Sequence, residues 1–595
     1  MKRLIIISLL ALLQFPLSIC GKTITIRMER YGMSAADSTQ NAAVAFQQAM
    51  SRIRKLANGN DRIIVSMPKG RYHFYPQGAA EREYYVSNHD QPNPKHVGIC
   101  MEGMKNVTLD GNGSDFIFHG QMMPLSLVKS SQCVLKNFSI DFDNPHIAQA
   151  KVVSNDTVSG TIIYEMAPWV EYKVEDGTLY TFGDGWKYQP NMCIAFEPGT
   201  RHIVFNTSDT PVKSSGITEL PGRQIEAEGW KNPKLIPGTV MVLRTWNRPA
   251  PGMFLSDDLN TRLENVKMHY AEGMGLLAQM CENITLNHFC VCLRGEKDPR
   301  YFSTQADATH FSGCKGLILS ENGLYENMMD DAINVHGTYL KLVEKIDDHT
   351  VKARYMHNQS YGFRWGEVGD SVQFIASRTM EIVGNPNTIK SIHAADKPIN
   401  KGVKEFWITF SRPLESIVAP ETSIGIENLT WTPKVVFRNN IVRNNRARGA
   451  LFSTPRHIVA ENNFFDHTSG TAILLCGDCN GWYETGACHD ITIRGNHFKN
   501  GLTNMFQFTN AIISIYPEIP DLKNQKKYFH SGIVIENNVF ETFDNPLLYA
   551  KSVDGLIFRN NILKINHEYP AFHWNKQRFL LERVINSKIE EPTEK

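Results

Sequence analysis

Three aspartates between residues 303 and 337 have the residue type and the spacing needed for acid–base chemistry. Asp307 and Asp330 are separated by 23 residues (330 minus 307), and Asp331 follows directly. A repeat of that length fits one coil of a parallel β-solenoid, whose rungs lie about 4.8 Å apart. We therefore expect Asp307 to lie beside the Asp330–Asp331 pair. Crowded carboxylates repel one another, and such a cluster can divide into a proton donor and a proton acceptor.

A structural role is the competing interpretation, because an aspartate at a coil corner often caps a turn. Three acids at the coil period, close in sequence to His310 and His336, favour a functional role. Neighbours on a regular strand point to opposite faces, so Asp330 and Asp331 can meet one substrate only if the chain bends between them. An inverting glycosidase separates its two carboxyls by about 6.5–9.5 Å and a retaining one by about 5 Å. The spacing in the sequence is compatible with either.

The elements that must position these acids follow the same period. Asn440 and Asn463 are 23 residues apart (463 minus 440), as are Asn538 and Asn561 (561 minus 538). Each asparagine pair follows a run of β-branched residues that would pack inside a coil. Asparagine tolerates the left-handed backbone of a corner, and its amide can bond to the asparagine on the next rung. The predicted fold class is all-β, a right-handed parallel β-helix whose open end is covered by a helix near residues 39–57.

Two long interruptions break the coil pattern. The first spans 126 residues (266 minus 140) and the second 100 residues (435 minus 335), and both contain alternating runs typical of hairpin strands. We interpret them as inserted antiparallel β subdomains that could wall a pocket over the aspartates. The expected division is 1–20 signal peptide, 21–148 first coils with the helix, 149–252 first insert, 253–338 central coils with the aspartates, 339–417 second insert and 418–595 C-terminal coils.

Composition limits the possible partners and the location. The chain has 595 residues, with 62 basic against 61 acidic residues, so nothing draws it to nucleic acid or to an anionic membrane. The apolar run from Leu4 to Ile19 follows a basic start and predicts an export signal, too short for a membrane span. We expect an exported protein, periplasmic or at the surface of a Gram-negative bacterium. Lipidation at Cys20 is the less favoured alternative.

Several motifs together resemble glycoside hydrolase family 110, the bacterial α-1,3-galactosidases. They are Tyr31-Gly32-Met33, the segment from Ala306 to His310, and the segment from Asn327 to Gly337. The resemblance implies exo-acting hydrolysis with inversion. It also implies release of terminal α-1,3-linked galactose from blood group B-type and linear Galα1-3Gal glycans. It further implies that the two inserts are β-barrels, and that Asp307, Asp330 and Asp331 occupy the places of the active-site acids.

Other residues near this stretch are weaker predictions for substrate binding. Asn334 and His336 could bond to sugar hydroxyls or simply hold the turn. The remaining candidates are Glu326, Glu367 and Trp365, the last as a platform for the sugar face. We expect a glycan substrate and neither a cofactor nor a metal. The oligomeric state is left open, a homodimer included.

Two other functions remain compatible with a secreted β-helix. One is a polysaccharide lyase, which would use a basic Lys or Arg to remove a proton. The other is a carbohydrate-binding surface protein without turnover. Unsaturated products would indicate the lyase, and release of free sugar would exclude the binder.

Overall fold

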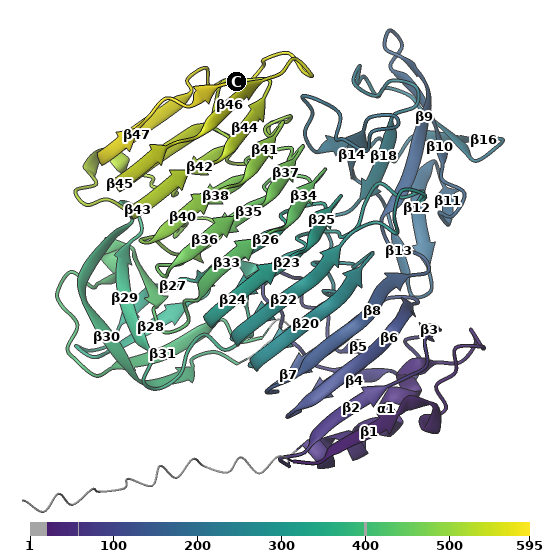
Figure 1. Cartoon of the computed structure of the whole chain (residues 1–595), viewed down its shortest axis with the longest axis horizontal. Helices are drawn as coiled ribbons and strands as arrows, with labels where there is room; N and C mark the ends of the chain where they lie inside the picture. Colours follow the sequence, from purple (N-terminus) through teal and green to yellow (C-terminus); the bar gives the residue numbers. More distant parts are fainter. Residues whose placement is uncertain (1–20, 58, 398–401) are drawn as a thin grey trace, which may run out of the picture.

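The chain folds into a parallel β-helix with two inserted β subdomains (Figure 1). The computed structural model describes residues 21–57, 59–397 and 402–595. The predicted export signal and Cys20 lie outside these residues. In the part of the chain that is described, no helix is long and apolar enough to cross a membrane. The parallel β-helix predicted from the sequence is confirmed.

Each complete coil contributes three short strands that pair with equivalent strands of the next coil. One coil consists of β33 (Lys434–Arg438), β34 (Ile441–Arg443) and β35 (Ala450–Phe452). The next consists of β36 (Ile458–Glu461), β37 (Phe464–Asp466) and β38 (Ile473–Leu475). The pairing is parallel, with Val435 opposite Ile458 and Ile441 opposite Phe464. Inside the coils, the rings of Phe465, Phe498 and Phe540 stack with centroids 5.2 and 5.1 Å apart.

A ladder of buried asparagines turns one corner of these coils. The Nδ2 atom of each donates to Oδ1 of the next, at distances of 3.2, 3.0, 3.0 and 3.1 Å along the series Asn440, Asn463, Asn496, Asn538 and Asn561. The residue before each ladder member has a left-handed backbone, with φ of 55° at Asn439 and 56° at Asn462. The predicted roles of the corner residues are therefore confirmed and refined: the first residue of each pair, an asparagine or Gly495, turns the chain, and the second forms the ladder.

The N-terminal end of the β-helix is covered by α1 (Ala42–Ala57). This helix buries Phe46, Met50 and Ile53 in the same core as β2 (Arg62–Ser66) and β3 (Arg71–Phe74). The helix was predicted near residues 39–57. Covering the first coils in this way protects strands that would otherwise be open to pairing.

The first insert extends from β9 (Ala148–Asp156) to β18 (Val240–Arg244). Its main sheet has seven antiparallel strands in the order β15-β14-β18-β9-β10-β17-β16, and a three-stranded sheet, β11-β12-β13, accompanies it. The second insert is a closed barrel in the order β27-β28-β31-β30-β29-β32, from Leu340 to Asn428. In Figure 1 the two inserts lie on opposite sides of the β-helix.

The second insert therefore continues past residue 417, its expected end. Strand β32 (Ile424–Asn428) closes the barrel by pairing with both β29 (Ser371–Ala376) and β27 (Leu340–Lys345). This short apolar run stands directly before the first C-terminal coil, and nothing in its sequence distinguishes it from a coil strand.

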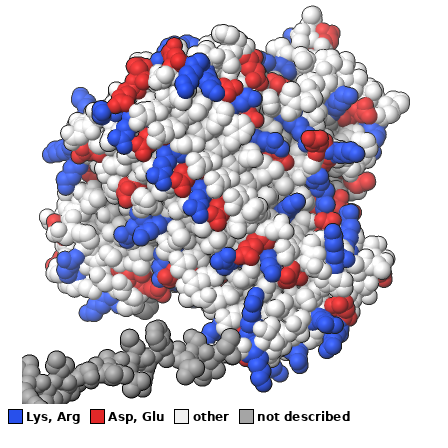
Figure 2. Space-filling model, in the orientation of Figure 1, with Lys and Arg blue, Asp and Glu red and all other residues white. Residues whose placement is uncertain are grey.

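Charge on the surface is mixed. On the face shown in Figure 2, Lys and Arg side chains are interspersed with Asp and Glu and do not gather into a patch of one sign. This distribution agrees with the near balance of 62 basic and 61 acidic residues.

Candidate active site

The three predicted aspartates meet at one corner of the β-helix. Asp307 stands just before β23 (Thr309–Ser312), and Asp330 and Asp331 stand just before β26 (Ile333–Thr338). One carboxylate oxygen from each lies within 4.8 Å of the other two. The expected meeting of the three acids is thus observed in the structure.

The register of the stack differs by one residue from the expected one. Strands β23 and β26 pair with Thr309 opposite Ile333, a step of 24 residues (333 minus 309). Asp307 therefore stacks on Asp331, not on Asp330. The step of 23 belongs to two of the C-terminal coils, and the coil that separates Asp307 from Asp331 is one residue longer.

A bend lets both neighbouring aspartates approach the same place. Asp330 and Asp331 precede the regular strand, where the corner is held by two backbone bonds to the coil below. The Met329 N–H donates to the Thr304 carbonyl at 3.0 Å, and the Ala308 N–H donates to the Asp331 carbonyl at 2.7 Å. Asp331 is 0% exposed and Asp330 8% exposed. The corner itself provides the turn that a straight strand would not allow.

Arginines surround the two C-terminal members of the trio. The carboxylate of Asp330 lies 3.2 Å from Arg248, 3.4 Å from Arg446 and 3.7 Å from Arg448. Asp331 accepts from Arg448 twice, at 2.8 Å from Nη2 and at 3.1 Å from the backbone N–H. Burial alone would raise the pKa of Asp330, but the guanidinium groups outweigh it and lower that pKa. Asp330 is therefore the ionised member.

The pKa values of the other two members move upward. Burial, and then the negative charge of Asp330, raise the pKa of Asp307 to about 7. Burial also raises the pKa of Asp331 well above its usual range, although Arg448 opposes that shift. Carboxyl groups with pKa values moved in opposite directions are the arrangement that acid–base catalysis needs.

A pocket of about 350 Å³ opens over the aspartates. Asp307 and Asp330 lie in its wall, together with residues from segments far apart in the chain. These are Asn88, Asp209, Trp246, Arg248, Met274, His310, Asn334, Arg446, Arg448, Leu451, Cys476, Asp478, Trp482, Glu484, Gln507 and Phe508. Trp246 and Trp482 are 40% and 36% exposed. Exposed rings in a pocket wall offer a flat apolar surface to a ligand.

Two of the predicted substrate contacts lie at the site, in different positions. Asn334 lines the pocket, and its Oδ1 accepts no hydrogen bond from any described residue. That oxygen is itself buried in the pocket wall. His336 is buried behind Asp307, where its ring meets His310 and the Gly337 carbonyl.

The other three predicted contacts are not brought to the pocket. The carboxylate of Glu326 bonds to Arg443 at 2.7 Å and to the Leu293 N–H at 3.1 Å. Glu367 is exposed and lies 3.1 Å from Arg364. Trp365 is buried in the core of the second insert and donates to the Thr338 carbonyl at 2.8 Å. Closeness in sequence to the aspartates was a poor guide to closeness in space. A β-helix brings together residues one coil apart and carries adjacent residues away around the coil.

The arginines were missed, although the sequence holds a signal for two of them. Asn322 and Asn439 turn equivalent corners 117 residues apart (439 minus 322), on either side of the second insert. The same step carries Asp331 to residue 448, an arginine, and the structure pairs Ile333 with Ala450 at that step. Trp246 and Arg248 follow the last strand of the first insert, and no repeat in the sequence indicates their position.

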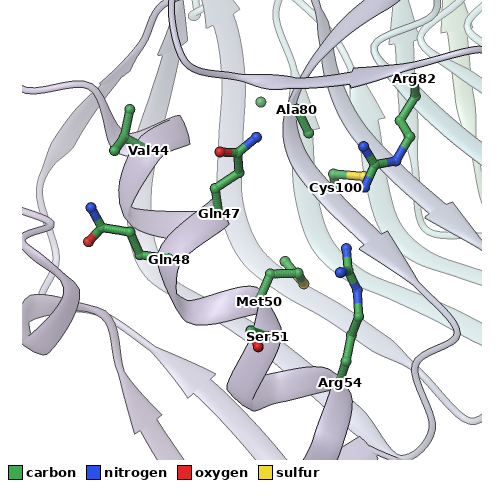
Figure 3. Close-up of a pocket in the computed structure, with 10 residues that line it drawn as sticks. Val44, Gln47, Gln48, Met50, Ser51, Arg54, Ala80, Arg82 and Cys100 are labelled. Atoms are coloured by element: carbon green, nitrogen blue, oxygen red, sulfur yellow. The ribbon is translucent and has the colours of Figure 1, made fainter.

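A second cavity lies at the N-terminal end of the molecule. It measures about 460 Å³ and lies beside α1, with Arg54, Arg82 and Cys100 in its wall (Figure 3). None of the described residues in its wall carries a carboxylate or an imidazole. This cavity therefore lacks the groups that hydrolysis of a glycoside requires.

Comparison with known proteins places the chain in a family. Residues 148–241 match the family model described as GLAA-B beta-barrel domain I, and residues 350–421 match GLAA-B beta-barrel domain II. An Alpha-1,3-galactosidase B of Parabacteroides distasonis is 61% identical over 573 residues, covering 96% of this chain and 94% of the relative. One from Bacteroides fragilis is 57% identical over 597 residues, covering 99% of this chain and 100% of the relative. The chain belongs to the alpha-1,3-galactosidase B family.

Proposed function

We propose that this protein is an exo-acting glycoside hydrolase that releases terminal α-1,3-linked galactose with inversion. Its proposed substrates are blood group B-type and linear Galα1-3Gal glycans. The observation that carries the proposal is the trio Asp307, Asp330 and Asp331, of which Asp307 and Asp330 line the pocket and have pKa values moved apart. The relatives align with nearly the whole chain and are named for the same activity, which supports the proposal.

The trio supplies the two proton transfers that hydrolysis requires. A protonated carboxyl gives its proton to the glycosidic oxygen as the bond to the anomeric carbon breaks. An ionised carboxylate takes a proton from the water that attacks that carbon. Oxygens within 4.8 Å of one another can hold such a water between two carboxylates. Because the three groups titrate as one unit, the acid and the base are best assigned by kinetics.

The pocket suits a single terminal sugar. Its volume of about 350 Å³ is near the lower end of the roughly 300–1,000 Å³ typical of ligand sites. We propose that Asn334 bonds to a sugar hydroxyl and that Trp246 or Trp482 packs against the apolar face of the ring. A small pocket of this kind favours removal of end residues over cleavage within a chain.

The two alternatives have less support. A lyase needs an uncharged basic group, and the arginines of the pocket are paired with carboxylates. Burial works against the charge on Arg446, but Asp330 and Asp209 outweigh it and raise its pKa. No lysine is among the described residues of the pocket wall. A binder without turnover has no use for three stacked acids, whose mutual repulsion opposes folding.

We also propose that the protein is exported to the periplasm or to the cell surface. The support is the basic start and the apolar run from Leu4 to Ile19. Cell fractionation with an antibody against the protein tests this, and a purely cytoplasmic signal would contradict it.

The activity is tested with a panel of α-linked galactosides. We expect free galactose from α-1,3-linked substrates and little from α-1,4- or α-1,6-linked ones. Proton NMR at early times should show β-galactose first, since inversion places water opposite the leaving group. The close spacing of the carboxylates is nearer to that of retaining enzymes, so this test is a stringent one. Early α-galactose would disprove inversion, and products absorbing in the ultraviolet would indicate a lyase.

A further inference from the structure

Two buried histidines form a hydrogen-bonded chain behind Asp307, and the proposed hydrolysis leaves them without a role. Nδ1 of His310 lies 2.7 Å from Oδ2 of Asp307. Its Nε2 lies 2.8 Å from Nε2 of His336, and Nδ1 of His336 lies 2.6 Å from the Gly337 carbonyl oxygen. The two imidazole planes are at 82° to each other, which lets an N–H of one ring point at a ring nitrogen of the other.

When both rings are neutral, the carbonyl at the end of this chain fixes the direction of every bond in it. A carbonyl only accepts, so Nδ1 of His336 carries a proton, and a neutral His336 then has a bare Nε2. The Nε2–H of His310 must therefore donate to His336. A neutral His310 then has a bare Nδ1, so the proton of the bond to Asp307 must come from the carboxyl. With both rings neutral, only a protonated Asp307 satisfies all three bonds.

The surroundings keep the ring of His310 neutral. Burial, followed by the neighbouring His336, lowers the pKa of His310 well below its usual range. Other segments also face this ring. Arg248 and His89 oppose a positive charge on it, whereas Asp330 and Glu484 favour one. The Oε1 atom of Glu484 lies 3.4 Å from Nε2 of His336 and accepts from the Asn88 amide at 2.9 Å. The Asn88 amide thus stabilises part of the negative charge of the Glu484 carboxylate.

We propose that His310 and His336 form a one-way hydrogen-bond relay that holds the proton on Asp307. Both are then positioning residues for the reaction, and His336 is not a contact to the sugar. The inference rests on the proposed function, because it explains how one member of the acid trio stays protonated beside an ionised neighbour. Loss of the acceptor at residue 336 would free His310 to turn its proton toward Asp307 and stabilise the ionised carboxylate.

Two substitutions at residue 336 separate the relay from a merely structural role. In His336→Gln the amide oxygen can still accept from His310, whereas in His336→Leu no acceptor remains. We expect His336→Leu to move the ionisation near pH 7 in the kcat/KM profile down by about one unit or more. His336→Gln should keep the wild-type position, and KM should change by less than about twofold in both variants. His530→Gln, at a buried histidine of β43 (His530–Glu536) outside the pocket, is the control for loss of packing and should not move the profile.

Different results would overturn the relay. A higher KM in both variants at an unchanged pH position would make His336 a sugar contact. Loss of activity in EDTA, restored by zinc, would also overturn the relay, because a metal held by the two rings and Glu484 would replace the hydrogen bond between the rings.

A second readout does not depend on activity. Nitrogen-15 NMR of the labelled wild-type protein should show the Nδ1–H form for His336 and the Nε2–H form for His310, with signals assigned from the variants. The reverse forms would overturn the relay even in an enzyme that releases galactose. A wild-type protein that shows these forms but releases no galactose would overturn the proposed function alone.

Discussion

The β-helix has two kinds of corner, which differ in how their buried polar side chains are stabilised. In the C-terminal coils, each inner asparagine of the ladder both donates to and accepts from its ladder neighbours, so the buried amides satisfy one another. In the catalytic coils, stacked carboxylates repel one another and depend on cations from other segments, such as Arg248 and Arg448. The first kind of corner stabilises the fold. The second opposes folding, and its retention is best explained by chemistry.

The largest expected effect comes from making the catalytic corner resemble the ladder. Asp307→Asn, Asp330→Asn and Asp331→Asn keep the side-chain shape but remove the carboxyl group that can gain and lose a proton. We expect each to lower kcat by at least ~100-fold, measured as galactose release. Glu367→Gln, at an exposed acid outside the pocket, is the matched control and should stay within about twofold. A near-normal rate for one aspartate variant would make that residue a turn cap.

The same variants assign the acid and the base. The variant of the acid should recover on galactosides with strongly acidic leaving groups, because these leave without protonation. The variant of the base should recover when azide replaces water as the nucleophile. If neither variant responds, the trio acts through binding and not through proton transfer.

A break in the ladder should have the opposite signature. In Asn496→Ala, the backbone N–H and Nδ2 of Asn463 lose the oxygen they share at 2.9 and 3.0 Å. Each buried group left without a partner destabilises a protein by about 1–3 kcal/mol. We expect a clear fall in melting temperature, with kcat within about twofold of wild type because no ladder residue lines the pocket. Asn545→Ala, at an exposed asparagine of a later coil, is the control. A large fall in kcat without a fall in melting temperature would contradict the division between the two corners.

The smallest expected effect is a change in how stability depends on pH. The pKa of Asp307 is raised to about 7 from an ordinary 3.8, so its contribution to stability is complete at low pH and is lost as the pH rises toward 7. Asparagine at this position does not titrate. The melting temperature of Asp307→Asn relative to wild type should therefore be higher at pH 8 than at pH 5, as thermal unfolding in matched buffers would show. A constant difference would mean that Asp307 is not protonated in the folded enzyme.

The ladder explains how much of the molecule could be predicted. Asn440, Asn463 and their equivalents turn corners by a local rule, so their spacing reveals the coils, and with them the neighbourhood of Asp307 and Asp330. The register could not be predicted, because coils differ in length by single residues. Arg448 follows Asp331 by 117 residues (448 minus 331), so its position becomes apparent only when Asn322 and Asn439 are recognised as equivalent corners. Trp246 and Glu484 reach the pocket from an insert and a loop whose paths are set by packing and not by a repeat.

The position of the second insert also determines the order and the interval in which the residues of the site are synthesised. Asp307, Asp330 and Asp331 leave the ribosome before the insert, whereas Arg446 and Arg448 follow it. At about 5–20 residues per second, the acids wait several seconds or more for these two counter-charges. Of the three arginines beside Asp330, only Arg248 is made before it. The acid stack therefore stays incompletely neutralised until the C-terminal coils begin to form. A nascent chain held on the ribosome before Arg446 has emerged should accordingly have a catalytic coil that proteases still cut, while the first coils already resist them.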